Sequence, residues 1–360
     1  MGTVTTLHHL AVDNFRSHTR AEFALGPVTV FVGPNGAGKT NLLESLWFLA
    51  TTRSFRTNHD AELIRWDAPA AQIIGDQYEI RLVQQPVQRK LLFINGVARR
   101  PLDYLGELRA VLFTPDSLQI ISGAPGQRRR FLDTLLAQAD RQNARDLVAY
   151  RHVLTERNAL LRLIGLNRAS PDELLPWNDQ LVRLGSRLTA QRLSLVEDLR
   201  SGVAQNYHLF GGDAGDALTV AYQATGSPNP DLFAAQLERL YDREVRFQVT
   251  LVGPHRDDLL LELRNRPISE HGSRGEMRTA LLALKSAEYL LLQTKTASAE
   301  PRLPPLLLLD DLFSELDQDH REALTDFLES AQTVITTTEM NYLPSRLHAV
   351  AVAIELGRSA

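Results

Sequence analysis

Eight consecutive residues near the N-terminus have the types and the spacing of a phosphate-binding site. They run Gly33-Pro34-Asn35-Gly36-Ala37-Gly38-Lys39-Thr40, which is a glycine, four residues, and then Gly-Lys-Thr. Glycines in this pattern let backbone N–H groups converge on an anion, and the lysine reaches the β- and γ-phosphates of a nucleotide. The threonine hydroxyl is a ligand for Mg²⁺. The sequence therefore predicts a site for a nucleoside triphosphate and its metal ion.

A pair of aspartates much later in the chain supplies the acids that such a site needs. Asp310 and Asp311 directly follow four leucines, Leu306 to Leu309, a run typical of a buried strand. A carboxylate at a strand end can orient Mg²⁺, and a second one can act as a general base toward the attacking water. We predict that Asp310 holds Mg²⁺, directly or through water, and that Asp311 is the catalytic base.

The elements that must position these residues are predicted by the apolar pattern. Pro27 to Val32 is a β-branched apolar run of strand length, and Leu42, Leu43 and Leu46 give the residues after the glycine loop one broad apolar face. The order is therefore strand, glycine loop, helix. Strands are also expected at 7–15, 22–25, 73–74, 78–83, 91–94, 247–252, 259–263, 306–309, 333–337 and 350–356, with a hairpin turn at 95–96. Helices are expected at 275–292 and 319–331, and this alternation predicts an α/β fold with a largely parallel sheet.

The chain between the loop and the acids is too long for a compact nucleotide-binding domain. Asp310 lies 271 residues after Lys39. Residues 126–207 are rich in Leu, Arg, Ala and Gln at helical spacing, which predicts three or four helices, and a loop rich in Gly, Asp and Pro follows at 211–230. We therefore expect a head domain made of residues 1–125 and 245–360, and a mostly helical inserted arm domain made of residues 126–244.

A second anion-binding helix end is indicated by Ser273-Arg274-Gly275-Glu276. These residues precede a helix whose apolar positions include Met277, Leu281 and Leu284. A serine and a glycine at a helix start leave N–H groups facing an anion. A nucleotide site that already has a phosphate loop does not need a second anion-binding helix N-terminus from the same chain. The motif makes sense if it closes over a nucleotide that another subunit holds.

Composition excludes several classes of protein. The 360 residues include 39 basic and 43 acidic ones, and this balance leaves no uniformly basic coat for a nucleic acid. The absence of cysteine excludes disulfides, zinc fingers, iron–sulfur clusters and thiol catalysis. His8, His9 and Asp13 interrupt the apolar core that a signal peptide requires, and no apolar run approaches the length of a membrane span. We expect a cytoplasmic protein with no membrane partner.

Basic residues nevertheless gather in two segments. Residues 80–102 hold five basic residues and no acid, and residues 127–168 hold nine arginines against four acids. Such clusters suit the phosphate backbone of duplex DNA without reading its sequence. The predicted DNA contacts are Arg89, Lys90, Arg99, Arg100, Arg128, Arg129 and Arg130. The alternative for the last three is that they pair with acids inside the head.

Together these motifs resemble those of the RecF family, a group of SMC-like, ABC-type ATPases. The segments that carry the resemblance are Asn14-Phe15-Arg16, 33–41, Arg53-Ser54-Phe55-Arg56, Ile94-Asn95-Gly96, Phe113-Thr114-Pro115-Asp116, Gly123-Ala124-Pro125, 128–133, Gly253-Pro254-His255-Arg256-Asp257-Asp258, 273–276, 306–311 and Ser314-Glu315-Leu316-Asp317. They span nearly the whole chain in the right order. The likeness is weakest between Ala137 and Tyr241, where only the helical character agrees.

The resemblance implies an ATP-dependent, DNA-binding ATPase in which ATP joins two heads head to tail. Residues 33–41, which include Asn41, would bind ATP and Mg²⁺ in cis. Ser273, Arg274 and Gly275 would contact the γ-phosphate of the ATP that the other subunit holds, and Ser314 and Asp317 would line the interface as the D-loop. By family, such a protein recognises gapped or duplex-flanked single-stranded DNA. It works with RecO and RecR to load RecA where single-strand-binding protein blocks access.

Several positions depart from the usual ABC pattern. Glu276 stands where a glutamine is usual, Asp311 where transport-type heads carry a glutamate, and residues 336–338 are threonines where those heads place a histidine. Because aspartate is shorter and the histidine is missing, we expect slow hydrolysis. Asp116 or Gln119 could occupy the family's glutamine-bearing linker loop. His255 is assigned no chemistry.

Two other classes of protein fit part of the pattern. The cytoplasmic ATPase subunit of a transporter would share the nucleotide site, but it would lack the arginine-rich insertion and would carry the histidine. A nucleotide-gated DNA clamp, in which ATP binding does the work and turnover is incidental, fits the weak catalytic groups. Comparing DNA retention with ATP and with a non-hydrolysable analogue separates the clamp from a cycling ATPase.

Overall fold

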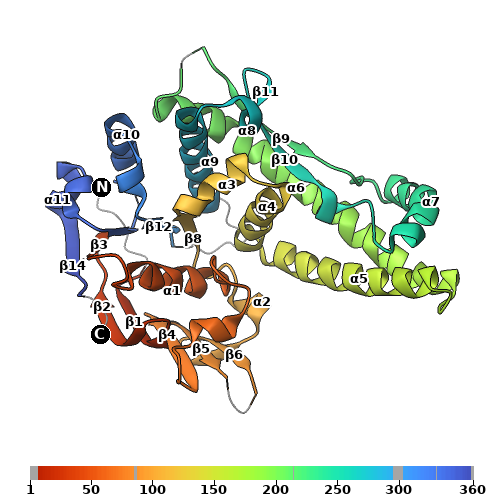
Figure 1. Cartoon of the computed structure of the whole chain (residues 1–360), viewed down its shortest axis with the longest axis horizontal. Coiled ribbons are helices and arrows are strands. Elements are labelled where there is room, and N and C mark those ends of the chain that lie inside the picture. Colours follow the sequence, from red (N-terminus) through yellow and green to blue (C-terminus); the bar gives the residue numbers. More distant parts are fainter. Residues whose placement is uncertain (1–6, 85–86, 214, 295–302, 330, 358–360) are drawn as a thin grey trace.

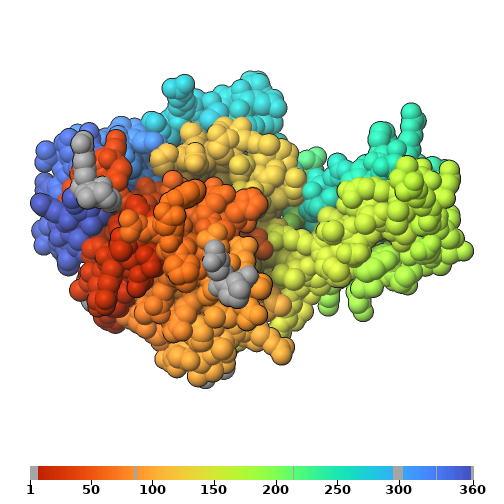
Figure 2. All heavy atoms as spheres, turned by 60° about the horizontal axis from the view of Figure 1, so that its bottom comes forward, coloured from red at the N-terminus to blue at the C-terminus, as the bar shows by residue number. Residues whose placement is uncertain are grey.

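The computed structural model of the chain describes residues 7–84, 87–213, 215–294, 303–329 and 331–357, so the first six residues of the N-terminal segment considered above lie outside it. The described strands form three sheets. Figure 1 shows the two larger sheets and several helices gathered into a head, from which a helical arm extends to one side. In Figure 2 the arm projects clear of the head as a separate ridge.

A five-stranded parallel sheet lies at the centre of the head, and its strand order is β14-β3-β13-β12-β8. The strands are β14 Ala351–Glu355, β3 Val28–Val32, β13 Thr333–Thr337, β12 Leu306–Asp310 and β8 Ala110–Phe113. Every neighbouring pair is parallel. The carboxyl ends of β3, β13 and β12 therefore lie at one edge of the sheet, where the glycine loop and the aspartate pair meet.

Both faces of this sheet are buried. Each strand sends alternate side chains to opposite sides, and each side packs into a hydrophobic core. Leu306 and Leu308 belong to the core beneath α1 (Lys39–Thr51), and Leu307 and Leu309 belong to the core that contains α9 (Arg274–Thr294). This arrangement explains why the sequence of β12 is a continuous run of leucines. The predicted α/β fold with a parallel sheet is confirmed.

A six-stranded antiparallel sheet covers the side of the head next to α1, in the order β2-β1-β4-β5-β6-β7. Its strands are β1 His9–Phe15, β2 His18–Ala24, β4 Ala70–Gly75, β5 Tyr78–Val83, β6 Arg89–Ile94 and β7 Val97–Arg99. The predicted hairpin turn is confirmed, since Asn95 (φ 52°) and Gly96 (φ 73°) both adopt the left-handed conformation that such a turn requires. The parallel pattern thus holds for the central sheet alone.

Four long helices follow: α4 Pro125–Ala139, α5 Arg141–Gly165, α6 Leu175–Leu209 and α7 Pro230–Phe247. The first three correspond to the segment 126–207, where three or four helices are predicted, and α7 lies beyond that segment and was not predicted as a helix. α5, α6 and α7 form the arm in Figure 1. The other end of α6 packs on α9 inside the head, where Gly202 allows close approach: a Cβ at this position would lie 3.2 Å from Cβ of Ala287. In the described part of the chain, no helix combines the length and apolarity needed to cross a membrane.

Two sequence expectations about this region are wrong. The loop expected at 211–230 contains β9 (Leu218–Gln223), which pairs antiparallel with β10 (Asp258–Leu263) in a three-stranded sheet completed by β11 (Arg266–Pro267). The strand expected at 247–252 does not form. Two of its backbone N–H groups are satisfied by side chains instead, since the Thr250 N–H donates to Asn158 and the Leu251 N–H donates to Glu244.

The shorter described helices complete the head. They are α2 Pro101–Tyr104, α3 Gln119–Ser122, α8 Ile268–His271, α10 Gln318–Leu328 and α11 Ser345–Val350. The helix expected at 319–331 is α10, which ends at Leu328. α8 leads directly into α9 and therefore sets where the Ser273 motif lies.

Candidate nucleotide-binding site and its second half

The glycine loop joins β3 to α1, and its glycines are required by its shape. Gly38 has a φ of 88° at the start of α1, and a Cβ there would lie 2.5 Å from Nε2 of His18. A Cβ on Gly33 would lie 2.4 Å from the carbonyl oxygen of Leu356. Both positions therefore favour a residue without a side chain. The resulting concave backbone at a helix N-terminus is the kind of cradle that binds phosphate.

Lys39 lies inside this loop. Its ammonium group donates hydrogen bonds to the carbonyl oxygens of Gly33 (2.7 Å) and Pro34 (3.0 Å). Burial lowers the pKa of Lys39, while the nearby carboxylates of Asp311 and Asp310 act in the opposite direction. The charge is thus held beside the loop and the acids, where a triphosphate chain can meet it.

Two hydroxyl side chains from two different elements converge on the carboxylate of Asp310. The Thr40 hydroxyl of α1 donates to Asp310 Oδ1 at 2.9 Å, and the Thr336 hydroxyl of β13 donates to the same oxygen at 2.7 Å. A hydroxyl and a carboxylate are the hard oxygen ligands that Mg²⁺ prefers, so the residues present fit this ion. Within the described ranges no group of three or more His, Cys, Asp or Glu side chains could hold a metal without a nucleotide.

Asp311 follows Asp310 in a left-handed conformation (φ 48°). Its N–H donates to the carbonyl and hydroxyl oxygens of Thr336 at 3.1 and 3.0 Å. One side-chain oxygen, Oδ1, is buried and has no hydrogen-bond partner among the described residues. Burial raises the pKa of Asp311. A buried carboxylate with an unsatisfied oxygen can accept a proton from a water molecule held against it.

A second layer of polar contacts surrounds the start of α1, and sequence reasoning did not find its centre, Glu44. The guanidinium of Arg16 forms two hydrogen bonds to the fully buried Glu44 carboxylate, at 2.8 and 2.9 Å. Arg56 lies 3.6 Å from the same carboxylate and donates to the Asn41 Oδ1 at 2.8 Å. The motifs 14–16 and 53–56 therefore meet here. The sequence does offer one signal for this cluster: Glu44 is an acidic residue between apolar residues of the predicted helix.

The Ser273 motif forms a capping box at the start of α9. The Ser273 N–H donates to Glu276 Oε2 (2.7 Å), and the Glu276 N–H donates to Ser273 Oγ (3.2 Å). Glu276 also pairs with Arg264 at 2.6 Å, and the hydrogen bonds from Ser273 lower the pKa of Glu276. Ser273, Arg274 and Gly275 are exposed. In Figure 1 this end of α9, beside α8, lies well apart from α1.

The predicted D-loop connects the aspartate pair to α10. The Ser314 hydroxyl donates to the carbonyl oxygen of Asp311 at 2.7 Å. Asp317 caps α10 by accepting the N–H of His320 at 3.0 Å, and its side chain is 65% exposed. Ser314 is therefore tied to the acids, and Asp317 faces outward.

The predicted DNA contacts differ in how far they are exposed. Arg128 is buried and donates two hydrogen bonds to the Asp258 carboxylate, at 2.7 and 2.8 Å, so it joins α4 to β10. Arg129 is partly buried and donates to the carbonyl oxygen of Asp257 at 2.9 Å. Pairing with an acid inside the protein is the alternative that the sequence left open for these arginines, and it holds for Arg128, whose guanidinium is committed to Asp258. The exposed residues are Arg89, Arg99, Arg100 and Arg130.

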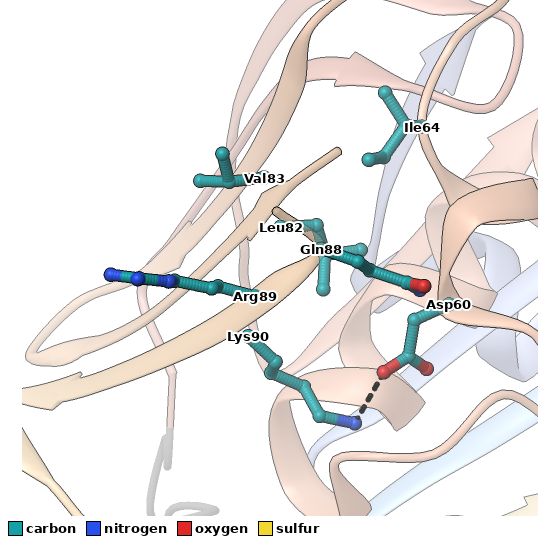
Figure 3. A pocket seen from close by; sticks show the side chains of 7 residues that line it. All are labelled: Asp60, Ile64, Leu82, Val83, Gln88, Arg89 and Lys90. Atoms are coloured by element: carbon teal, nitrogen blue, oxygen red, sulfur yellow. Dashed lines mark ion pairs between the residues drawn. The ribbon is translucent and has the colours of Figure 1, made fainter. Parts of the chain in front are cut away.

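Lys90 lies in a small pocket on the antiparallel sheet, of about 210 Å³. Figure 3 shows its side chain turned toward Asp60, which it contacts at 2.7 Å. Its ammonium group also donates to the carbonyl oxygen of Thr52 at 2.9 Å. The ammonium group of Lys90 is therefore bound by other residues of the head, whereas the neighbouring Arg89 is exposed.

The segment 253–258 joins the arm to β10. His255 Nδ1 and the Tyr150 hydroxyl of α5 share a hydrogen bond of 2.7 Å. Burial lowers the pKa of His255 to about 4. Asp257 is fully buried and accepts the Thr225 N–H at 2.7 Å. These contacts explain the motif as a structural joint and agree with assigning His255 no chemistry.

The parallel sheet, the glycine loop on β3 and the aspartate pair on β12 define the class of protein: an ABC-type ATPase head of the SMC-like kind. Residues 6–355 match the family described as the RecF/RecN/SMC N terminal domain. The chain belongs to the RecF family. It is 39% identical over 371 residues to the DNA replication and repair protein RecF of Roseiflexus castenholzii, covering 92% of each chain. It is 38% identical to that of Moorella thermoacetica, covering 95% of this chain and 92% of the relative.

Solved structures agree with this assignment. The recombination mediator protein RecF-ATPrS of the RecFOR pathway superposes with a TM-score of 0.87 at 26% identity, over 98% of this chain and 96% of the other. An Smc head bound to the C-winged helix domain of ScpA superposes with a TM-score of 0.54 at 13% identity, which shows a shared fold.

Proposed function

We propose that this protein is an ATP-dependent, dimerising, DNA-binding ATPase of recombinational repair. Residues 33–41 bind the ATP phosphates, and Thr40 and Asp310 hold Mg²⁺, which supplies charge stabilisation to the phosphates when bound. Asp311 accepts the proton of the attacking water. The observation that carries the proposal is the exposed Ser273 motif, which lies away from the chain's own glycine loop and so suits the ATP of a second subunit.

The capping box supports this role for Ser273 and explains Glu276. Ser273 Oγ accepts a hydrogen bond from the Glu276 N–H, and the exposed Ser273 hydroxyl can turn from the Glu276 carboxylate to donate to a phosphate oxygen. The Glu276 carboxylate is engaged by the Ser273 N–H and by Arg264. Its charge is therefore neutralised by these contacts, which reduces its repulsion of a γ-phosphate.

The relatives named above are DNA replication and repair proteins, and one solved relative is called a recombination mediator of the RecFOR pathway. We infer that the chain binds duplex or gapped DNA and helps RecO and RecR load RecA onto single strands coated by single-strand-binding protein. The exposed arginines 89, 99, 100 and 130 are the proposed phosphate contacts.

A clamp with little functional hydrolysis is the second candidate, and the contacts of Thr336 favour it. The threonines 336–338 stand where transport-type heads place a histidine, and the hydroxyl of Thr336, one of the three, donates to Asp310 at 2.7 Å. A hydroxyl committed to the metal-binding carboxylate does not replace a histidine that senses phosphate. ATP binding alone would then close the dimer, and hydrolysis would serve as a slow release.

Sedimentation of the purified protein tests the proposal. We expect a monomer without nucleotide, a dimer with ATP and Mg²⁺, and co-sedimentation of the dimer with duplex DNA. The Lys39→Met variant is the matched control, because it retains the surface of the dimer but loses the ammonium group inside the glycine loop. A protein that stays monomeric at saturating ATP, with and without DNA and its partners, would contradict the proposal. Equal DNA retention with ATP and a non-hydrolysable analogue would favour the clamp.

A further inference from the structure

A histidine lies between the Ser273 helix and the D-loop within one protomer. His320 Nδ1 lies 2.7 Å from Asp317 Oδ1, and its Nε2 lies 2.8 Å from the Thr279 hydroxyl on α9. The side chain of His320 is only 12% exposed. The ring therefore spans the space between two elements that the sequence separates by about forty residues and that both face the proposed dimer interface.

The contact continues beyond Thr279 to the signature itself. The Thr279 hydroxyl lies 3.1 Å from the carbonyl oxygen of Gly275, one helical turn earlier. Thr279 is buried, so these contacts are shielded from competing water. The path thus runs from the exposed carboxylate of Asp317, through the His320 ring and the Thr279 hydroxyl, to the backbone of Gly275.

Helix capping alone does not require this bridge. The cap of α10 is the hydrogen bond from the His320 backbone N–H to Asp317 at 3.0 Å, which any residue except proline can supply at position 320. The side-chain contacts are additional. They fix the direction of the Asp317 carboxylate relative to the first turn of α9, where Ser273 and Gly275 are exposed.

We propose that His320 is a positioning residue that locks the D-loop to the Ser273 helix, so that Asp317, Ser273 and Gly275 meet the other subunit as one rigid surface. The inference rests on the proposed ATP-dependent dimer. It assigns His320 no contact with nucleotide. Its role is to remove the freedom of the two loops before they dock, which improves association without a new contact across the interface.

The test measures two quantities on purified variants: ATP binding by the monomer and the dissociation constant of the ATP-dependent dimer. We expect His320→Ala to bind ATP like the wild type, because Lys39 and Asp310 are untouched, and to weaken the dimer about 100-fold. The estimate is about tenfold for each of the two equivalent surfaces, the size expected when one net hydrogen bond is lost.

Thr279 provides the matched pair of variants. Thr279→Val removes the hydroxyl at nearly constant volume and is expected to reproduce the defect, while Thr279→Ser keeps the hydroxyl and is expected to restore dimerisation. Thr294→Val is the control, because Thr294 makes the same kind of bond to a preceding carbonyl (3.0 Å to Leu290) at the far end of α9. It should leave the dimer unchanged.

The outcomes separate the two levels of inference. Wild-type dimerisation by both His320→Ala and Thr279→Val would overturn the role of His320 while leaving the proposed function intact. Equal defects in Thr279→Val and Thr279→Ser would also overturn it, since the hydroxyl would then be irrelevant. A wild-type chain that fails to dimerise with ATP would overturn the proposed function and this inference with it.

Discussion

Neighbouring arginines in the segment 128–130 should respond in opposite ways to replacement by alanine. Arg128 is buried, and its guanidinium donates two hydrogen bonds to Asp258 and one to the carbonyl oxygen of Gly123 at 2.7 Å. Arg130 is exposed. We expect Arg128→Ala to lower the free energy of unfolding, and Arg130→Ala to leave it unchanged while weakening DNA binding.

The size of the first effect follows from the contacts. Removing one partner of a buried ion pair destabilises a protein by about 3–5 kcal/mol, because the other charge is left buried. The side chains of Arg128 and Asp258 are 11% and 15% exposed, so water can reach the stranded carboxylate and the lower value, about 3 kcal/mol, applies. With an unfolding entropy of about 2.1 cal/mol/K per residue, a chain of 360 residues should lose about 4 °C in Tm.

The assay pairs thermal unfolding with DNA binding at several salt concentrations. Each phosphate contact contributes about 0.9 to the slope of log affinity against log salt. Arg130→Ala should therefore reduce the slope by about one at wild-type Tm, and Arg128→Ala should lower Tm at an unchanged slope. An Arg128→Ala protein with the wild-type Tm and a reduced slope would refute this reading of the ion pair.

Four further results are expected. Lys39→Met should abolish ATP binding, seen as loss of nucleotide retention on equilibrium dialysis, because it removes the ammonium group that lies inside the loop. Ser273→Arg should spare ATP binding by the monomer but block ATP-driven dimers in light scattering; dimers at the wild-type level would refute the shared site. Asp311→Asn should slow phosphate release at least 100-fold, the range of a lost general base, and prolong the dimer. Because burial lowers the folded-state pKa of His255 from about 6.5 to about 4, the unfolded chain binds more protons in that interval. The free energy of unfolding should thus decrease, by at most about 3 kcal/mol, as the pH is lowered from about 6.5 to about 4. Urea unfolding of His255→Asn at the same pH values should lack this decrease.

Much of the fold could be predicted because its strands and helices have strong periodic patterns. The leucine run of β12 predicts a strand buried on both faces, and the hairpin at Asn95 follows from turn chemistry. The missing strand at 247–252 could not be predicted. Its apolar residues match a strand, but Glu244 and Asn158 bind its backbone from outside the segment. β9 was missed because its surroundings are rich in glycine and aspartate, and its partner β10 lies about forty residues later.

The candidate site divides in the same way. The glycine loop and Asp310 are local motifs whose chemistry can be read from spacing, and the structure brings Thr40 to within 2.9 Å of Asp310. Glu44 could not be assigned, because its partners Arg16 and Arg56 come from separate segments. The arginine segments show the limit most clearly. Charge counting treats Arg128 and Arg130 alike, while only the packing of α4 against β10 decides which of them is committed to an acid.

The caps of the helices near the site distinguish their roles. No side chain of the described residues caps α1, which begins at a left-handed Gly38, so no side-chain cap competes with an anion for the N–H groups of its first turn. α9 and α10 carry their own caps, Ser273 with Glu276 and Asp317. A helix that is already capped offers an anion less from its backbone, and its contribution must come from a side chain such as the Ser273 hydroxyl. This difference fits α1 as the helix that holds the phosphates and α9 as the helix that completes the site from another subunit.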